Sequence, residues 1–391
     1  MNGGKDLNKA LNFLKTHYRF ILNVGFLIVV FVILIVPLTR INKQAKSATE
    51  NRNLAPKTKL VKSGKINTKF GTEFESWLSD RFRGRAKLLA FYNNVNTELL
   101  GRIENKRAFQ GKNGWLFYKA ENSIPNYQNK ILFTDTQLNK INNNLLKRKN
   151  LLKENGIKFY VLIAPDKNRI YGEYYHPGIN KVSTQGRAEQ LLSSLSSSNL
   201  NVVYPLTEIL SAKSQGAVYY RLDTHWNNYG AFIGYSNLMK AIKKDYPTLN
   251  VLELNDFEVK TRPEKSGDLL NMLNVSLQKL KLEDNSVLVL DKKVPYNYKY
   301  LKNKGRKGIH TKNAKPLNNL RVFVLRDSFT TAMEPFVSET FAEANYVWTH
   351  NFNNQYKEIL KFKPDIVIHE MVERYAHVLL NDNPPLKGGK Q

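Results

Sequence analysis

Residues 321–329 read RVFVLRDSF, and they carry the strongest indication of a fold. Residues 322–325 are an uninterrupted apolar run, which is typical of a strand buried on both faces of a sheet. The polar residues 326–328 follow directly, and a helical pattern begins near Thr330. A buried strand, a tight turn and a helix in this order predict an α/β unit with a polar turn at the carboxyl end of the strand.

The same alternation of strand and helix recurs along the chain. Further strands are expected at 158–164 (KFYVLIA), 201–204, 346–348 and 365–369. Helical patterns lie at 138–155, 189–196, 228–244 and 357–362. Apolar strands separated by helices predict a doubly wound α/β fold, in which a parallel sheet is covered by helices on both faces.

The regions outside this alternating pattern differ in composition. Residues 41–68 are rich in Lys and Asn and predict a tether, whereas the aromatic residues of 70–82 recur at helical spacing and predict a helix with a buried aromatic face. Residues 253–316 break the alternation with Lys-rich runs, so we expect an insertion there. The predicted organisation is an anchor segment at 1–40, the tether, and one α/β domain at 69–385.

Residues 20–38, FILNVGFLIVVFVILIVPL, contain no charged residue. A helix of about 20 apolar residues crosses a bilayer, so this run predicts one transmembrane helix. The cations before it favour a cytoplasmic amino terminus and an extracytoplasmic domain, although further cations follow it. An uncleaved anchor is preferred to a signal peptide because AKSA at 45–48 is a poor cleavage site. We expect a single-pass protein of the cell membrane.

The chain has 391 residues, with 60 Lys and Arg, 33 Asp and Glu, a formal net charge of +27 and no cysteine. The missing cysteine excludes disulfides, thiolate metal sites and a cysteine nucleophile. The positive charge favours an anionic partner such as an acidic polymer or phospholipid headgroups; the alternative is a solvated, lysine-rich surface. No nucleic-acid partner is expected, because the cations are spread along the chain and form no nucleic-acid-binding motif.

Ser328 follows the predicted strand end and opens a helix, a position that suggests two different roles. Backbone N–H groups at a helix start point toward an anion formed beside them, so a nucleophilic serine there would have half of an oxyanion hole. A serine in the same position also caps helices, because its hydroxyl accepts a hydrogen bond from the backbone. The stretch around Ser328 leaves both roles open.

Residues 221–232, RLDTHWNNYGAF, contain the partners that a nucleophilic serine needs. A histidine can take the proton of the hydroxyl, and a carboxylate on its second ring nitrogen stabilises the imidazolium. Asp223 and His225 are two residues apart, so in an extended loop their side chains share one side of the backbone. We predict a catalytic triad of Ser328, His225 and Asp223. The alternative is a capping Asp and a hydrogen-bonded His beside Trp226.

Other polar residues near strand ends are expected to be structural. Lys167 and Arg169 should be exposed loop cations, and Glu370 and Glu373 are acids of the kind that helix starts favour. The histidines form no H-x-x-x-H or H-E-x-x-H pattern, and no phosphate-binding glycine loop is present. We therefore expect neither a metal nor a cofactor.

Six segments occur together in the order found in one known family. Between residues 70 and 373 they read FESWLSDRFRGR, NGWLFY, APDKNRIYGEYYHP, LDTHWNNYGA, SGDLLNML and VLRDSF. In combination they resemble the alginate O-acetyltransferase family, the AlgJ/AlgX-like proteins with an SGNH-hydrolase-like domain. The resemblance implies a flavodoxin-like parallel sheet, with Ser328 as nucleophile, His225 as base and Asp223 as orienting carboxylate.

The resemblance also implies a function. The chain would transfer acetyl groups to a secreted or cell-surface polysaccharide through an acyl-serine intermediate, with a membrane-bound O-acyltransferase passing acetyl groups outward. One departure is Arg326, which stands where hydrolases of this type have the Gly of Gly-Asp-Ser. Their oxyanion-hole geometry cannot be assumed beside so large a cation, and Arg326 is a candidate contact for an acidic sugar.

Two other classes of function stay open. A carbohydrate O-acetylesterase would use the same three residues with water as the acceptor. A noncatalytic polysaccharide-binding or assembly protein would keep the fold and the basic surface without needing the triad.

Overall fold

A computed structural model of the chain describes residues 103–280, 282 and 284–380 almost continuously. Nearer the amino terminus it describes residues 16–20, 22–28, 30–31, 46–47, 52–62, 64–81, 91 and 95. The chain divides into two units, residues 1–102 and residues 103–391, and each is described here by itself.

The amino-terminal unit contains short strands and one described helix of three turns. They are β1 (Lys46–Ser47), β2 (Arg52–Asn53), β3 (Val61–Lys62), β4 (Lys65–Ile66) and α2 (Phe70–Arg81). The helix α2 begins where the aromatic pattern predicts a helix, but none of its side chains is buried. The ring of Phe74 stacks on those of Phe70 and Trp77, at 5.5 and 5.6 Å between centroids. The expected buried aromatic face is therefore wrong for α2, because its rings contact one another instead of a core.

The predicted transmembrane run lies partly outside the described residues. Residues 16–20, 22–28 and 30–31 are helical, and the run continues beyond them to residue 38. Within the part of the chain that the structure describes, no helix has both the length and the apolar character needed to cross a membrane.

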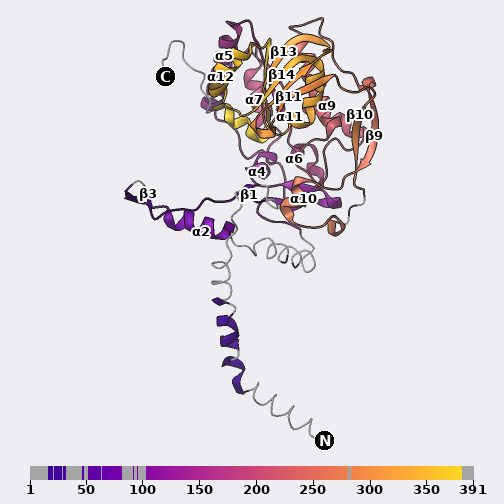
Figure 1. Cartoon of the computed structure of the whole chain (residues 1–391). Helices are drawn as coiled ribbons and strands as arrows, with labels where there is room; N and C mark the ends of the chain where they lie inside the picture. Colours follow the sequence, from indigo (N-terminus) through magenta and orange to yellow (C-terminus); the bar gives the residue numbers. More distant parts are fainter. Residues whose placement is uncertain are drawn as a thin grey trace. The chain divides into compact units, whose positions relative to one another are not determined.

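A seven-stranded sheet forms the centre of the second unit (Figure 1), in the order β11-β12-β14-β13-β15-β7-β8. The strands are β7 (Lys158–Ala164), β8 (Asn201–Val203), β11 (Tyr298–Asn303), β12 (Ile309–Asn313), β13 (Asn318–Arg326), β14 (Phe341–Trp348) and β15 (Ile366–Val372). The strands from β14 to β8 are parallel, whereas β12 is antiparallel to both of its neighbours. The predicted α/β fold with a parallel sheet is confirmed.

Helices cover both faces of this sheet (Figure 1). The described helices of this unit are α4 (Ser123–Tyr127), α5 (Asp135–Lys153), α6 (Lys167–Ile170), α7 (Arg187–Leu195), α8 (Leu206–Ala212), α9 (Asn228–Ile242), α10 (Asp268–Leu273), α11 (Thr330–Thr340) and α12 (Phe352–Phe362), of which α10 packs on β5 and β6 in a separate cluster and not on the main sheet. Along β7 the even-numbered residues from Tyr160 pack into one core with α9 and α11, and the odd-numbered residues from Phe159 pack into a second core with α5 and α12. Successive side chains point to opposite faces, so a strand covered on both faces is apolar throughout.

Short 3-10 turns connect several of these elements. They are η1 (Lys112–Gly114), η2 (Gly172–Tyr174), η3 (Lys213–Gln215), η4 (Leu254–Asp256), η5 (Leu277–Leu280), η6 (Gly305–Lys307) and η7 (Glu373–Leu380). Two antiparallel pairs lie outside the main sheet: β5 (Ala108–Gln110) with β6 (Leu116–Tyr118), and β9 (Phe257–Pro263) with β10 (Ser286–Lys292). The segment 253–316 thus supplies a separate strand pair and, through β11 and β12, two strands of the main sheet. Its description as an insertion stays a prediction.

Trp226 is fully buried between the two segments that carry the predicted site. Its indole N–H donates to the backbone carbonyl of Phe329 at 2.8 Å. The indole has room because α9 carries glycine beside it: a Cβ added at Gly234 would lie 2.8 Å from the ring. The fold therefore ties the loop that contains Asp223 and His225 to the turn that follows β13.

Candidate active site

The predicted triad residues lie in adjoining segments at the carboxyl end of the sheet. Ser328 follows β13 and precedes α11, while Asp223 and His225 precede α9. The ring of His225 lies 5.0 Å from that of Phe329, measured between centroids. The structure therefore brings His225 beside the residue that follows Ser328.

Asp223 and His225 form the pair that their spacing predicts. Asp223 Oδ1 lies 2.6 Å from His225 Nδ1 and also accepts the backbone N–H of His225 at 3.0 Å. An ionised carboxylate only accepts hydrogen bonds, so Nδ1 carries the proton and Nε2 is the basic nitrogen. Nε2 is buried and has no hydrogen-bond partner among the described residues.

This pairing changes the pKa of both groups. Burial alone would lower the pKa of His225, but the hydrogen bond and charge of Asp223 outweigh burial, and the pKa is raised above its usual 6.5. Burial alone would raise the pKa of Asp223, but the hydrogen bond from His225 and its charge lower that pKa to about 2. Asp223 is therefore ionised at neutral pH, and His225 is a stronger base than a free imidazole.

Ser328 is half-buried, and it does not cap α11. The helix begins at Thr330, its N-cap residue is Phe329, and no side chain accepts a capping hydrogen bond there. The alternative role of Ser328 as a helix cap is therefore wrong. Because His225 Nε2 has no partner among the described residues, the Ser328–His225 bond of a resting triad is not made, and the triad stays a prediction.

Asp327 and Glu370 hold the turn that carries Ser328. Asp327 accepts the N–H groups of Phe329 and Val372, both at 2.8 Å, and donates its own N–H to Glu370 at 3.1 Å. Since the N–H of Phe329 is occupied, one of the donors expected for an oxyanion hole is not available. Burial, reinforced by the charge of Asp327, raises the pKa of Glu370 well above its usual value and so favours its neutral form. Glu370 belongs to β15, and its expected place at a helix start is wrong.

Arg326 packs behind the turn and is 2% exposed. Its Nη1 donates to the carbonyl of Asp327 at 3.2 Å and to the hydroxyl of Thr331 at 2.9 Å. Its guanidinium carbon lies 4.8 Å from the ring centroid of Trp348. These contacts brace the turn and leave little of the side chain for a substrate. A sugar contact by Arg326 stays a prediction.

Lys167 and Arg169 are 3% and 8% exposed, so the expectation of exposed loop cations is wrong. The amine of Lys167 donates to the backbone carbonyls of Leu116, Arg221 and Asp223, at 2.5, 2.8 and 3.0 Å. An ammonium group tolerates burial when each of its donors has an acceptor. Lys167 therefore fixes the backbone at Asp223. This role was not predictable from the sequence, because the three carbonyls converge only in the folded chain.

Asp268 is a further residue of the site, which the sequence analysis did not single out. Its N–H donates to Asp223 Oδ2 at 2.9 Å, and its carboxylate accepts the N–H and hydroxyl of Thr224, at 2.8 and 2.7 Å. The preceding Gly267 permits this approach, because an added Cβ would lie 2.1 Å from the carbonyl oxygen of Leu222. Asp268 and His225 thus engage different oxygens of Asp223 and fix its orientation. The sequence feature that could have indicated this role is the Gly267-Asp268 pair at the start of an apolar helix.

Asp223, His225 and Asp268 each place one possible metal-ligand atom within 4.8 Å of the others. Every carboxylate oxygen of this group already accepts an N–H or O–H group of the protein, and His225 Nδ1 points its proton at Asp223. These atoms therefore already form hydrogen bonds within the protein, and we assign no cation to this group.

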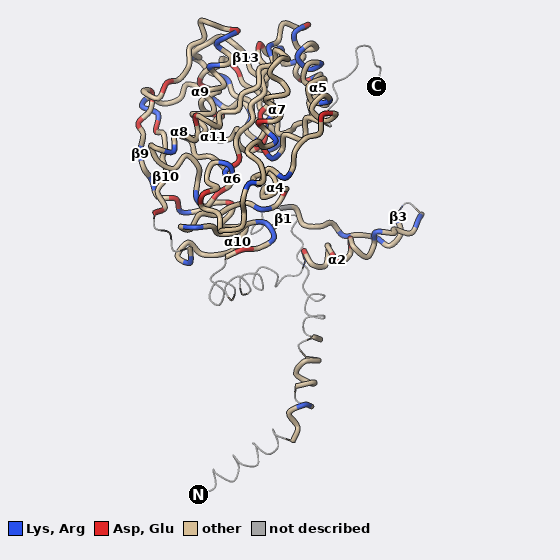
Figure 2. Tube along the Cα trace, turned by 180° about the vertical axis from the view of Figure 1, so that it is seen from behind, with Lys and Arg blue, Asp and Glu red and all other residues tan. Residues whose placement is uncertain are grey.

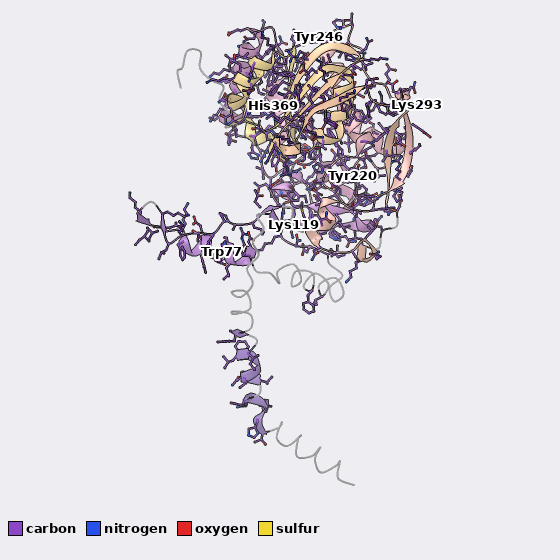
Figure 3. All side chains as sticks on the ribbon, in the orientation of Figure 1. Trp77, Lys119, Tyr220, Tyr246, Lys293 and His369 are labelled. Atoms are coloured by element: carbon purple, nitrogen blue, oxygen red, sulfur yellow. The ribbon has the colours of Figure 1, made fainter. Side chains whose placement is uncertain are left out.

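A hollow of about 380 Å³ opens beside Asp223. It is lined by Tyr220, which Figure 3 labels, by Glu264 and Ser266, and by residues of β9 and β10. Neither His225 nor Ser328 lines it, so the hollow adjoins the acid end of the pair and not the serine.

Fold and site together define an α/β domain of the SGNH-hydrolase-like type, with an Asp-x-His pair beside a serine turn. The structure of Bacillus cereus PatB1 has a TM-score of 0.53 and 16% identity, and covers 68% of this chain and 95% of its own. The structure of that protein with a sulfonyl adduct has a TM-score of 0.51 and 14% identity, and covers 71% of this chain and 97% of its own. At these identities the likeness shows the fold alone.

Residues 108–299 match the family model described as "SGNH hydrolase-like domain, acetyltransferase AlgX". A stretch of 125 residues is 31% identical to the probable alginate O-acetylase AlgJ of Pseudomonas syringae pv. tomato, and it covers 31% of this chain and 31% of that relative. Over residues 108–299 the chain is similar to the SGNH-hydrolase-like acetyltransferase domain of this family, and it spans about a third of the length of the curated relative it matches. The region matched by the family model contains Asp223, His225 and Asp268 and ends before Ser328.

Asp268→Asn is expected to move the acid limb of the pH dependence of kcat/KM toward lower pH. Neutral His225 is the proposed base, so the rate falls as the pH drops through its raised pKa. The charges of Asp223 and Asp268 raise this pKa, whereas the charge of Arg374 lowers it. Removing the charge of Asp268 should therefore lower the pKa of His225. The acid limb is measured as the pH dependence of kcat/KM for hydrolysis of an activated acetyl ester across the neutral pH range.

Thr224→Val is the matched control, because it removes the hydroxyl that contacts Asp268 and keeps the carboxylate charge. The acid limb of kcat/KM in this control should coincide with that of the unmodified chain. If the acid limb of Asp268→Asn also stayed at the same pH, the contribution of the Asp268 charge to the pKa of His225 would be refuted.

Proposed function

We propose that this chain transfers acetyl groups to hydroxyl groups of a secreted or cell-surface polysaccharide, through an acyl intermediate on Ser328. The observation that carries the proposal is the 2.6 Å contact between Asp223 and His225, with the basic nitrogen of His225 beside the serine turn and without a hydrogen-bond partner in the described part of the chain. The match of residues 108–299 to an acetyltransferase family model supports acetyl transfer as the reaction. The P. syringae relative is named a probable alginate O-acetylase, which suggests an acidic polymer as acceptor.

In the proposed reaction His225 acts first as base and then as acid. Nε2 takes the Ser328 hydroxyl proton while Oγ bonds to the acetyl carbonyl carbon; the bond from that carbon to the donor then breaks, and the donor leaves with the proton. In the second half, Nε2 takes the proton of a sugar hydroxyl, whose oxygen bonds to the acetyl carbon. The bond to Ser328 breaks, and Oγ recovers the proton. Asp223 stabilises the imidazolium formed in both halves.

The donor and the location of the chain are part of the same proposal. An extracytoplasmic domain has no supply of acetyl-CoA, so a multispanning membrane-bound O-acyltransferase is proposed to deliver acetyl groups from the cytoplasm. The uncharged run at 20–38 and the cations before it support a membrane anchor with the domain outside.

Ser328→Ala is expected to abolish transfer and leave the fold intact. Loss of a nucleophile typically lowers the rate by at least about 10³-fold, whereas loss of one half-buried hydroxyl has little effect on the free energy of unfolding. Transfer from an activated acetyl ester to an oligouronate is measured by mass spectrometry of the sugar. The control, Ser196→Ala at an exposed serine, should retain full activity. Transfer by Ser328→Ala at the unmodified rate would refute the nucleophile, and release of free acetate without acetylated sugar would indicate an esterase.

The full-length chain is expected in the membrane fraction and should resist a wash with alkaline carbonate. Protease added outside cells with a permeable outer layer should release the domain by cutting after about residue 41, because a single helix anchors it. A released fragment that starts near residue 48 without added protease would instead show signal-peptide cleavage. A domain protected from protease in such cells would place it in the cytoplasm and contradict the proposal.

A further inference from the structure

The segment 292–315 is the most one-sidedly charged part of the described domain. It holds nine of the chain's 60 Lys and Arg residues and none of its 33 Asp and Glu residues. Figure 2 shows cations over much of the domain, with acids interspersed in most places. This segment is therefore distinguished by the absence of acids, and it forms β11, η6 and β12 at one edge of the main sheet.

Eight of the nine cations of this segment are exposed and not neutralised, whereas the ninth, Lys292, is ion-paired with Glu339 at 2.5 Å. The exposed ones are Lys293 (Figure 3), Lys299, Lys302, Lys304, Arg306, Lys307, Lys312 and Lys315. None of these eight forms a salt bridge with an acid among the described residues, whereas on the β9–β10 pair Lys260 and Arg262 are both ion-paired to Asp291. Unpaired like charges repel one another, so the folded edge bears an electrostatic cost that an anionic ligand would relieve.

The turn between β11 and β12 presents its cations on an ordered backbone. The turn reads KGRKG at 304–308 and is closed by backbone hydrogen bonds, from Lys304 to the carbonyl of Gly308 at 3.1 Å and from Gly308 to that of Gly305 at 3.0 Å. Gly305 and Gly308 have φ values of 54° and 111°, which favour glycine. The cations therefore project from a fixed turn, so little backbone entropy is lost when a ligand binds.

This turn lies at the same end of the sheet as Ser328. The backbone register at that end runs across four strands (Figure 1), from Asn303 to Ile309 to Tyr346 to Val324. Adjacent strands are about 4.8 Å apart, so β11 lies roughly 14 Å from β13, the strand that ends just before Ser328. An extended polymer bound at the serine could reach the turn.

One indole connects the turn to the candidate site. The guanidinium carbon of Arg306 lies 4.5 Å from the ring centroid of Trp348, and that of Arg326 lies 4.8 Å from the same centroid. Arg326 in turn donates to the carbonyl of Asp327, next to Ser328. Of the two arginines on Trp348, Arg326 is buried and Arg306 is exposed, so Arg306 is the one that can meet a ligand.

We propose that this basic edge, defined as Lys302, Lys304, Arg306 and Lys307, is a binding subsite for an acidic polysaccharide and holds the acceptor beside Ser328. The proposal rests on the proposed function for the choice of acceptor. A polyuronate carries one carboxylate on each sugar, so neighbouring sugars would meet successive cations of the turn. An anionic membrane or a nucleic acid would be attracted by the same charge. The position beside the serine favours the glycan, because an acceptor polymer must cross the surface next to the nucleophile.

The test measures binding of the full-length chain, in neutral detergent, to immobilised polygalacturonate at increasing salt. The Ser328→Ala background prevents turnover, so the readout does not depend on catalysis.

The variant Lys304→Gln/Arg306→Gln/Lys307→Gln should bind about tenfold more weakly, because it loses three surface contacts of modest strength each. The control Lys140→Gln/Lys147→Gln/Lys153→Gln removes equal charge from exposed positions on α5, the helix that packs on β7 across the sheet. It should change affinity less than twofold, and the thermal unfolding midpoints of both variants should match.

Equal losses in the two triple variants, or no loss in the turn variant, would overturn the subsite. Equally strong, turn-dependent binding to phosphatidylglycerol vesicles or to single-stranded DNA would overturn the assignment to a glycan. In the active enzyme the turn variant should raise KM for the polymer and leave kcat and transfer to a single uronate unchanged. If the unmodified chain bound polygalacturonate through the turn but transferred no acetyl group, the proposed reaction would be refuted, whereas the proposed binding subsite would be supported.

Discussion

The hydrogen bond from Trp226 to the carbonyl of Phe329 is the constraint on which the candidate site depends. It joins two segments 103 residues apart, and both residues are fully buried. A buried indole N–H without an acceptor costs about 1–3 kcal/mol, so the loop of His225 cannot leave the serine turn without that loss. The Trp in Asp-x-His-Trp therefore sets where the histidine stands, and the Asp sets which of its nitrogens is basic.

Around this hydrogen bond, buried polar groups fix the backbone of the candidate site. Within the part of the chain that the structure describes, they make no hydrogen bond to the basic nitrogen of His225. Lys167 binds the carbonyl of Asp223, and Asp268 donates to its carboxylate. Glu370 accepts the N–H of Asp327 beneath the serine turn. In contrast, Nε2 of His225 has no partner among the described residues. A site whose backbone is held in place by buried side chains and whose base makes no hydrogen bond to a described residue is preorganised to bond a substrate or the serine.

How far the sequence predicts this structure depends on where each interaction is formed. The bounds of β7 match the apolar run at 158–164, since burial on both faces leaves a local pattern. The Asp223–His225 pair was predictable from its spacing. The roles of Lys167, Asp268 and Glu370 in the site were not predictable from the sequence, because their hydrogen-bond partners converge only in the folded chain. The strand β11 was not predicted, because its side chains are mostly exposed and it leaves no apolar pattern; exposed lysines are a common feature of edge strands.

The central claim is that His225 activates Ser328, and mass spectrometry of the acylated chain tests it most directly. The chain is exposed briefly to an activated acetyl ester, quenched in acid, digested and sequenced. The account predicts one rapidly formed acetyl group on the peptide that contains Ser328, and a large fall in its rate of formation in His225→Ala. An acetyl group that forms equally fast without His225, or that resides on another residue while the chain turns over, would contradict the account.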